Sequence, residues 1–377
     1  MKDTETLRKL LHQNPELSGK EYATAERIQD FLSRVPPDEM FTNIGGTGIL
    51  AIYHPQQEVQ QTVLFRCELD ALPIQEINDF EHRSNTINIS HKCGHDGHMA
   101  IMCELAKKIY EKKAINTKVV LLFQPAEENG EGAIAVYNDE RFKSLQIDKV
   151  FALHNLPGFP MHEIVVKDHT FTCAVNSIII QLFGKTSHAG EPEKGDNPAL
   201  CIASVIGQFN QLMQPDPNKE KYTILTPVYI HMGSKDYGIS AGYGEVHYTF
   251  RRAANNEMKE LEKELQDIAQ STAKKYNLEP KISWTQRFSA NENNPQEVDI
   301  VRRSAEQLQL SLTEKQSPLQ WGEDFGVFTE HFDGAMFGLG SGENTPALHN
   351  PDYDFPDELI ETGAQIFYQI ISNIDAQ

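Results

Sequence analysis

The chain contains 377 residues, of which 39% are hydrophobic and 23% are charged, and its 34 basic and 54 acidic side chains give a formal net charge of −20. This composition excludes an intrinsically disordered protein, and the length suits two or three domains. The negative charge repels phosphate backbones and anionic lipid, so we expect neither nucleic acid nor a membrane surface as a partner.

The N-terminal segment, the lengths of the apolar runs and the cysteine content bear on the cellular compartment of the protein. Residues 1–17 read as a charged amphipathic helix rather than a signal peptide, and no stretch approaches the roughly 18 apolar residues of a membrane span. The five cysteines are scattered and odd in number, which favours reduced thiols over a disulfide framework. We therefore expect a cytoplasmic protein.

Apolar runs alternate with helical patterns through the first half of the chain, which favours a mostly parallel sheet covered by helices. The predicted strands are 47–54, 62–69, 119–124 and 150–154, with a helix over 98–111. The alternation of helices and strands returns near the end of the chain, with predicted helices at 297–309, 323–331 and 357–373 and a strand at 335–340.

Between these parts the pattern changes to the strand-helix-strand-strand-helix-strand order of a ferredoxin-like unit. Its predicted elements are 176–183, 196–214, 223–230, 244–252, 255–276 and 280–286. We predict an α/β protein in which residues 1–174 and 290–377 form one three-layer α/β/α domain. Residues 175–289 would form an inserted ferredoxin-like α+β domain.

Potential metal ligands gather in two segments. HKCGHDGH (91–98) brings one thiol and three imidazoles together before a helix, and Cys93 and His95 could aim at one point from the turn. QPAEE (124–128) places Glu127 and Glu128 after a probable central strand, where one carboxylate could hold a metal ion and another could move a proton. Each segment alone could equally be a surface turn or an acidic loop.

Three further residues sit at similar positions. His154 ends a predicted strand, His349 precedes the last helix, and Asp70 follows the strand 62–69, where it could orient a metal-bound imidazole. Singly, each could be an ordinary histidine or turn residue. Because parallel strands end at one edge of a sheet, the segments together predict a single cavity able to bind two metal ions.

The motifs resemble those of the dinuclear-metal amidohydrolase and exopeptidase family, in particular its hippurate hydrolase, N-acetyldiaminopimelate deacetylase and indole-acetyl-amino-acid hydrolase branch. The resemblance rests on HKCGHDGH, QPAEE, His154, SHAGEP (187–192), GEDF (322–325) and LHNPDYDF (348–355). It implies that two divalent metal ions are bound by a set of five ligands, namely Cys93, His95, Glu128, His154 and His349. Glu127 would be the general base, deprotonating the metal-bound water and then protonating the leaving amine.

The resemblance also implies that residues 1–174 and 290–377 are the catalytic, metal-binding domain and that residues 175–289 are a lid and dimerisation domain, in which two residues have roles. His188 would stabilise the oxyanion, sometimes across a homodimer formed through the lid, and Arg251 would pair with a substrate carboxylate. Arg252 is the neighbouring alternative, and strand alternation puts the two arginines on opposite faces. The chain departs from the family where RCELDALP replaces RADMDALP, with Cys67 and Glu68 in place of a small residue and an Asp, a change that could affect the surroundings of Asp70.

We therefore expect metal-dependent hydrolysis of N-acetyl or N-aroyl amino acids. The alternatives are a dipeptidase or aminopeptidase on the same metal centre and a non-catalytic relative that binds amino-acid conjugates. Zinc or manganese suits the ligands best, with nickel or cobalt as alternatives. The sequence leaves the acyl group, the preferred amino acid and the metabolic pathway open.

Overall fold

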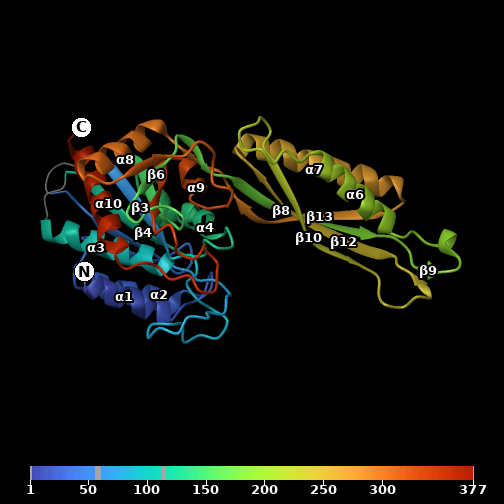
Figure 1. Ribbon diagram of the computed structural model, residues 1–377, viewed down its shortest axis with the longest axis horizontal. Helices are drawn as coiled ribbons and strands as arrows, with labels where there is room; N and C mark the ends of the chain where they lie inside the picture. The colour runs from blue at the N-terminus through green and yellow to red at the C-terminus, as the bar shows by residue number, and fades with distance from the viewer. Residues whose placement is uncertain (1, 56–60, 113–115, 377) are drawn as a thin grey trace. The chain divides into compact units, whose positions relative to one another are not determined.

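The computed structural model describes residues 2–55, 61–112 and 116–376, which divide into two compact units (Figure 1). The second unit comprises residues 172–290 and 317–322, and the first comprises the remaining described residues. Residues 317–322, which we expected in the catalytic domain, belong to the second unit because Cys173 N donates to Leu319 O at 3.0 Å and Arg251 Nε donates to Gln320 O at 2.7 Å.

The first unit is built on a mixed sheet. Within the described residues it has eight strands in the order β1-β2-β4-β3-β5-β16-β6-β15. They are β1 (Glu39–Ile44), β2 (Gly48–Tyr53), β3 (Thr62–Glu68), β4 (Lys118–Gln124), β5 (Lys149–Leu156), β6 (Ile164–Val166), β15 (Leu312–Glu314) and β16 (Asp333–Gly340). The central strands β4, β3, β5 and β16 are parallel, which confirms the predicted α/β class, whereas β1, β2 and the β16–β6 pair are antiparallel.

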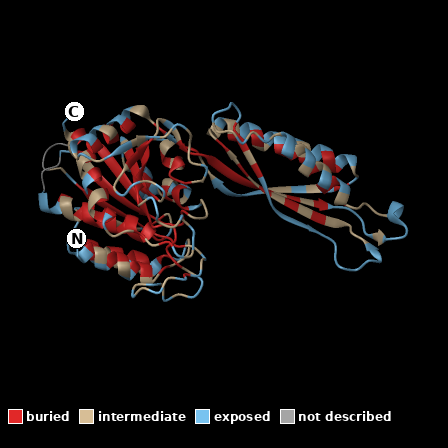
Figure 2. Cartoon of the chain, in the orientation of Figure 1, coloured by how far each residue is buried: buried red, intermediate tan, exposed pale blue. Residues whose placement is uncertain are grey.

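Helices cover both faces of this sheet. They are α1 (Lys2–Gln13), α2 (Tyr22–Leu32), α3 (His95–Lys112), α4 (Gly132–Asn138), α5 (Glu140–Lys143), α8 (Pro295–Gln307), α9 (Gly326–Thr329) and α10 (Leu359–Asp375). Alternate residues of β3 face opposite ways, so that Phe65 joins the core beside α3 and α10 while Arg66 contacts Asp324, just before α9. The burial pattern in Figure 2 follows these layers, with red residues concentrated in the sheet.

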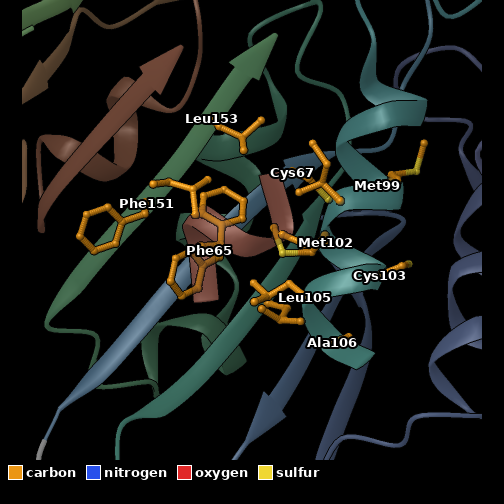
Figure 3. Close-up of a cluster of buried hydrophobic side chains, with 14 of the residues drawn as sticks. Phe65, Cys67, Met99, Met102, Cys103, Leu105, Ala106, Phe151 and Leu153 are labelled. Atoms are coloured by element: carbon orange, nitrogen blue, oxygen red, sulfur yellow. The ribbon is translucent and has the colours of Figure 1, made fainter. Parts of the chain in front are cut away.

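The main core lies between α3 and the sheet (Figure 3). Met99 and Met102 of α3 pack there with Phe65 and Cys67 of β3 and with Phe151 of β5, and all five side chains are buried. Burying an apolar side chain of this size contributes about 1.5–3 kcal/mol. This packing fixes the start of α3 against the ends of the strands.

The second unit has the predicted ferredoxin-like order. Its elements are β8 (Ala174–Phe183), β9 (Ser187–His188), a 3-10 helix (Pro192–Lys194), α6 (Ala199–Gln211), β10 (Thr223–Met232), β11 (Ile239–Ser240), β12 (Tyr243–Arg252), α7 (Asn255–Lys275) and β13 (Glu279–Phe288). The main sheet is antiparallel in the order β10-β12-β8-β13, and β9 pairs with β11. Asn197 Oδ1 accepts from Ala199 N at 2.8 Å, which ends the preceding loop and starts α6.

Two short strands, β7 (His169–Thr172) and β14 (Asn291–Asn293), complete the assignment. Among the helices that the structure describes, none combines the length and the apolar character needed to cross a bilayer.

Candidate metal centre

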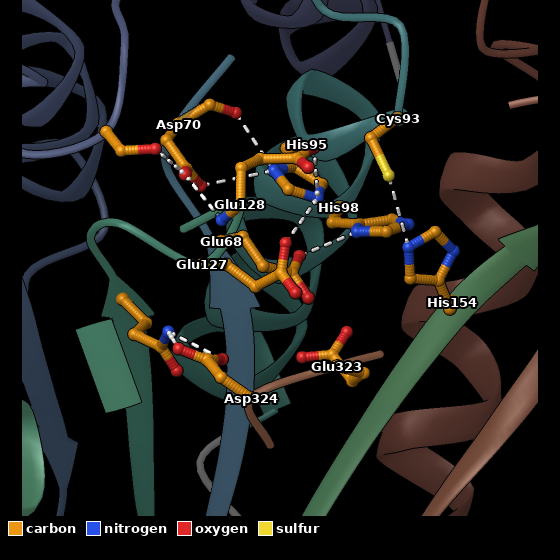
Figure 4. Close-up of polar contacts among 12 residues, drawn as sticks. Glu68, Asp70, Cys93, His95, His98, Glu127, Glu128, His154, Glu323 and Asp324 are labelled. Carbon is orange, nitrogen blue, oxygen red and sulfur yellow. Dashed lines mark hydrogen bonds and ion pairs between the residues drawn. The ribbon is translucent and has the colours of Figure 1, made fainter. Parts of the chain in front are cut away.

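The candidate ligands of the first unit meet at the carboxyl ends of its central strands (Figure 4). Glu68 ends β3, Glu127 and Glu128 follow β4, and His154 lies near the end of β5. The carboxyl ends of parallel strands are where open α/β sheets place their ligands, so the topology itself builds the site.

Cys93 and His95 reach the site from the turn that enters α3. Gly94 allows this turn through its φ of +94°, and a Cβ atom there would lie 2.7 Å from Asn155 Oδ1. The helix begins at His95, earlier than the residue-98 start of the predicted helix. Cys93 Sγ lies 3.5 Å from His154 Nε2, so the fold brings together two side chains that are 61 positions apart in the chain.

The carboxylates of Glu127 and Glu128 lie close to the imidazoles of the candidate ligands. His95 Nε2 lies 3.8 Å from both Glu127 Oε2 and Glu128 Oε1, and His349 Nε2 lies 3.8 Å from Glu128 Oε2. The His349 side chain is 52% exposed, whereas the other four candidate ligands are largely buried.

Among the described residues, five groups of potential ligand atoms have the spacing that a metal ion requires, and three of them are made up of the candidate ligands and Glu127. Within each of them the atoms lie within 4.8 Å of one another. The three groups are Cys93 with His95 and His154, Cys93 with Glu128 and His349, and His95 with Glu127 and Glu128. Cys93, His95 and Glu128 each belong to two of these three groups, so the ligand atoms are spaced as two neighbouring ions would need.

Asp70 holds the His95 ring. The ring Nδ1 lies 2.9 Å from the Asp70 main-chain oxygen and 3.3 Å from Asp70 Oδ1, and it donates a proton there. Asp70 Oδ2 accepts from Ser18 Oγ at 2.8 Å and from Glu128 N at 2.9 Å. This arrangement leaves the Nε2 lone pair of His95 aimed at the ligand cluster, as a metal-binding imidazole requires.

Buried polar atoms supply a test of whether the residues fit a metal ion. His95 Nε2 and Glu128 Oε1 are both buried and have no hydrogen-bond partner among the residues that the structure describes. Such atoms are rare in folded proteins, because each one costs about 1–3 kcal/mol when left unpaired. Their convergence, with a thiol and two more imidazoles nearby, fits divalent cations bound by nitrogen, oxygen and sulfur.

The pKa values of the buried site residues also indicate a site for cations. Burial and the neighbouring carboxylates Glu323 and Glu128 raise the pKa of Glu127 well above its usual value, and burial raises the pKa of Glu128 to about 8 although His95 opposes it. Burial also raises the pKa of the Cys93 thiol and lowers that of His154. The protein groups alone carry more negative charge than the buried site accommodates, and cations would offset it.

Sequence reasoning missed a residue pair beside the ligands. His98 Nδ1 lies 2.7 Å from Glu68 Oε2, and its Nε2 lies 2.6 Å from Asn155 Oδ1. The spacing of three residues from His95 put His98 on the same helix face and could have signalled this position. Glu68, at which the sequence differs from the family motif, thus contacts His98 and does not alter the surroundings of Asp70 as we expected.

A buried arginine links this pair to the GEDF segment. The Arg66 guanidinium donates to Glu68, to Glu323 Oε1 at 2.8 Å and to Asp324 Oδ1 at 2.5 Å. Burial would raise the pKa of Glu68, but Arg66 and His98 hold it well below its usual range. Glu323 Oε1 also accepts from Phe325 N at 3.0 Å, just before α9.

The two remaining candidates, His188 and Arg251, belong to the second unit rather than to the ligand cluster. His188 lies on β9, is exposed, and accepts from Gly190 N at 3.0 Å through Nδ1. Arg251 of β12 is partly exposed, while the Arg252 side chain is buried and lies 3.9 Å from Glu257 Oε2. The two arginines therefore differ in exposure, as strand alternation predicts.

Known proteins resemble the chain over almost its whole length. It is 28% identical to an uncharacterised hydrolase of Staphylococcus haemolyticus over 97% of this chain and 96% of that one. It is 27% identical to a hippurate hydrolase of Campylobacter jejuni, covering 97% and 95% of the two chains. The Bacillus subtilis YxeP protein, a dinuclear metal binding peptidase from the M20 family, shares the fold with a TM-score of 0.84 at 22% identity, over 99% and 98% of the two chains.

The family assignment rests on the match of residues 64–373 to the model of peptidase family M20/M25/M40. This segment includes Asp70, all five proposed ligands and Glu127. The chain therefore belongs to peptidase family M20/M25/M40 and is a metal-dependent hydrolase of amide bonds.

Proposed function

We propose that this enzyme hydrolyses the amide bond of N-acyl amino acids with two divalent cations, zinc or manganese, held by Cys93, His95, Glu128, His154 and His349. The observation that carries the proposal is the pair of ligand groups that overlap at Cys93, with Glu127 beside them. Bound there, two cations would supply Lewis acidity, which lowers the pKa of a water molecule and polarises the substrate carbonyl.

Glu127 is the proposed general base. It takes a proton from the attacking water on a side-chain oxygen and later gives it to the nitrogen of the departing amine, so that an acid and an amine leave. Burial and the neighbouring carboxylates, which raise the pKa of Glu127, favour a group that holds the proton between the two transfers. Its side chain also keeps some contact with solvent, being 6% exposed.

Two residues of the second unit complete the proposed machinery. His188 is exposed on a short strand and could donate to the oxyanion that develops on the substrate carbonyl. Arg251 carries a planar guanidinium suited to the free carboxylate of an amino acid. Its Nε is fixed by Gln320 O, which orients the side chain.

The substrate class follows from these groups and from one relative. The similarity to a hippurate hydrolase supports an amino acid that is blocked at nitrogen, since hippurate is an N-acylated glycine. An arginine for the carboxylate and a metal-polarised carbonyl for the acyl group match such a molecule at both ends.

We also propose a homodimer through the second unit. Strand β10 is an edge of its sheet, and Val228, Tyr229 and Ile230 on it are all exposed. An exposed apolar edge strand invites pairing with another strand, and a second copy offers the same strand in the antiparallel direction. Sedimentation equilibrium of the purified protein tests this, with a monomer at micromolar concentration as the contrary result.

The substrate proposal is tested by the release of free amine from N-acetyl amino acids, N-benzoyl amino acids and unblocked dipeptides. The protein is loaded with manganese or zinc, and a chelator-treated sample is the control. We expect chelator-sensitive cleavage of the blocked amino acids. Preference for unblocked dipeptides would favour a peptidase, and no turnover with either metal would favour a binding protein.

A further inference from the structure

Lys92 is the residue before the candidate ligand Cys93, and it is completely buried, which is rare for a lysine. Its ammonium group donates to the main-chain oxygen of Tyr353 at 2.7 Å and to Glu76 Oε1 at 2.5 Å. Its own main-chain oxygen accepts from His349 N at 2.7 Å. Lys92 therefore holds both ends of the segment 349–353 and directly precedes Cys93.

His349 depends on such support because its own side chain is poorly packed. The imidazole is 52% exposed, and the main chain of His349 has a φ of +66°, which is unfavourable for a residue other than glycine. The position of the imidazole is therefore set by the main chain of residues 349–353. Lys92 contacts that main chain at its first and last residue.

The ammonium group is itself held in place. Glu76 accepts from Ser84 N at 2.6 Å through its second oxygen, and His12 Nε2 lies 3.1 Å from Glu76 Oε1. The segment 349–353 has further support, because Ile77 N donates to Pro351 O at 3.2 Å. Loss of the ammonium group removes the contact with Tyr353 O but keeps the main-chain hydrogen bond from His349 N to Lys92 O, so it should loosen His349 without releasing the whole segment.

We propose that Lys92 is a positioning residue, which fixes His349 relative to Cys93 so that both can bind the same metal ion. This inference rests on the proposed function, because it takes Cys93, Glu128 and His349 as ligands of one ion. Residues that orient metal ligands typically contribute 10–100-fold to metal affinity. Lys92 itself binds neither substrate nor metal in this account.

The test is calorimetric titration of the chelator-stripped protein with manganese alone, which requires no substrate. In Lys92→Met we expect one binding step to weaken 10–100-fold and the other to change less than about threefold. Lys149→Met is the matched control, because Lys149 Nζ pairs with Glu297 at 2.6 Å but lies at the opposite end of β5 from His154. We expect both of its binding steps to match those of the wild type.

A second variant separates positioning from a purely structural role. Lys92→Met combined with Glu76→Gln removes the buried charge pair without leaving a lone carboxylate, so this variant decides the question if the single one fails to fold. We expect it to keep the weakened step. The visible spectrum of the cobalt-loaded variant should show fewer ligands at one ion while the band of the Cys93 thiolate persists.

Two results would overturn the inference. One is wild-type affinity in both steps for a folded Lys92→Met or for the double variant, and the other is equal weakening of both steps. These results are distinct from a failure of the proposed function, in which the unmodified protein would bind no pair of ions or would cleave no blocked amino acid.

Discussion

Replacing Glu127 with glutamine tests the proposed base with little disturbance of the structure. Glutamine has almost the same shape but cannot take the proton, so we expect kcat to fall by about 10²–10⁴-fold. This corresponds to about 3–5 kcal/mol in the activation free energy. The pKa of Glu127 is raised by burial and by Glu323 and Glu128, so a neutral side chain should be tolerated and metal binding should persist.

The assay compares kcat for a blocked amino acid with bound metal per subunit and the free energy of unfolding. Glu131→Gln is the matched control, because Glu131 lies four positions further along the same loop and is exposed. We expect normal activity for that variant. A folded, metal-loaded Glu127→Gln protein that retains kcat within about threefold of the wild type would refute the role of Glu127.

Three further predictions follow from the site and its surroundings. The variant Cys93→Ser should bind manganese or zinc more weakly, because a hydroxyl stays protonated where a thiol can ionise beside a cation. Calorimetry measures this affinity, and unchanged metal content would contradict the role of Cys93 as a ligand. Metal affinity should rise between pH 6 and pH 8, by up to about tenfold per pH unit for each proton released, because Glu128, with a pKa of about 8, is protonated below that pH and must ionise to bind. A flat affinity across this range would contradict the assignment. His12 is buried, which lowers its pKa, but Asp96 and Glu76 outweigh this effect and raise the pKa to about 9. The stabilising charge of His12 is therefore fully present below about pH 6.5 and is lost as the pH rises through 9. Urea unfolding should show that the stability difference between wild type and His12→Gln shrinks by about 3 kcal/mol between pH 6 and pH 10, and a constant difference would contradict this.

The sequence predicts the central strands well because they are buried on both faces and appear as continuous apolar runs. It predicts the ends of polar-rich helices less well. We expected a helix over 323–331, but α9 covers only Gly326–Thr329 because the side chains of Glu323 and Asp324 are committed to Arg66. The antiparallel strand β1 carries exposed residues and gives no such apolar run.

The candidate ligands were predictable because strand ends and the turn before α3 concentrate thiol, imidazole and carboxylate groups in short motifs. The contacts that support them were not. Arg66 and Asp324 are 258 residues apart, and Lys92 meets Glu76 and Tyr353 only in the folded chain. A buried ion pair leaves no periodic signal in the sequence, since each of its members alone reads as a surface residue.

The most direct test of the proposed dinuclear metal centre is a titration of the chelator-stripped protein with manganese while the hydrolysis of an N-acyl amino acid is followed. We predict that the stripped protein is inactive and that activity reaches its maximum when two ions are bound per subunit. Full activity without added metal, in a sample shown to contain none, would contradict hydrolysis by a pair of metal ions.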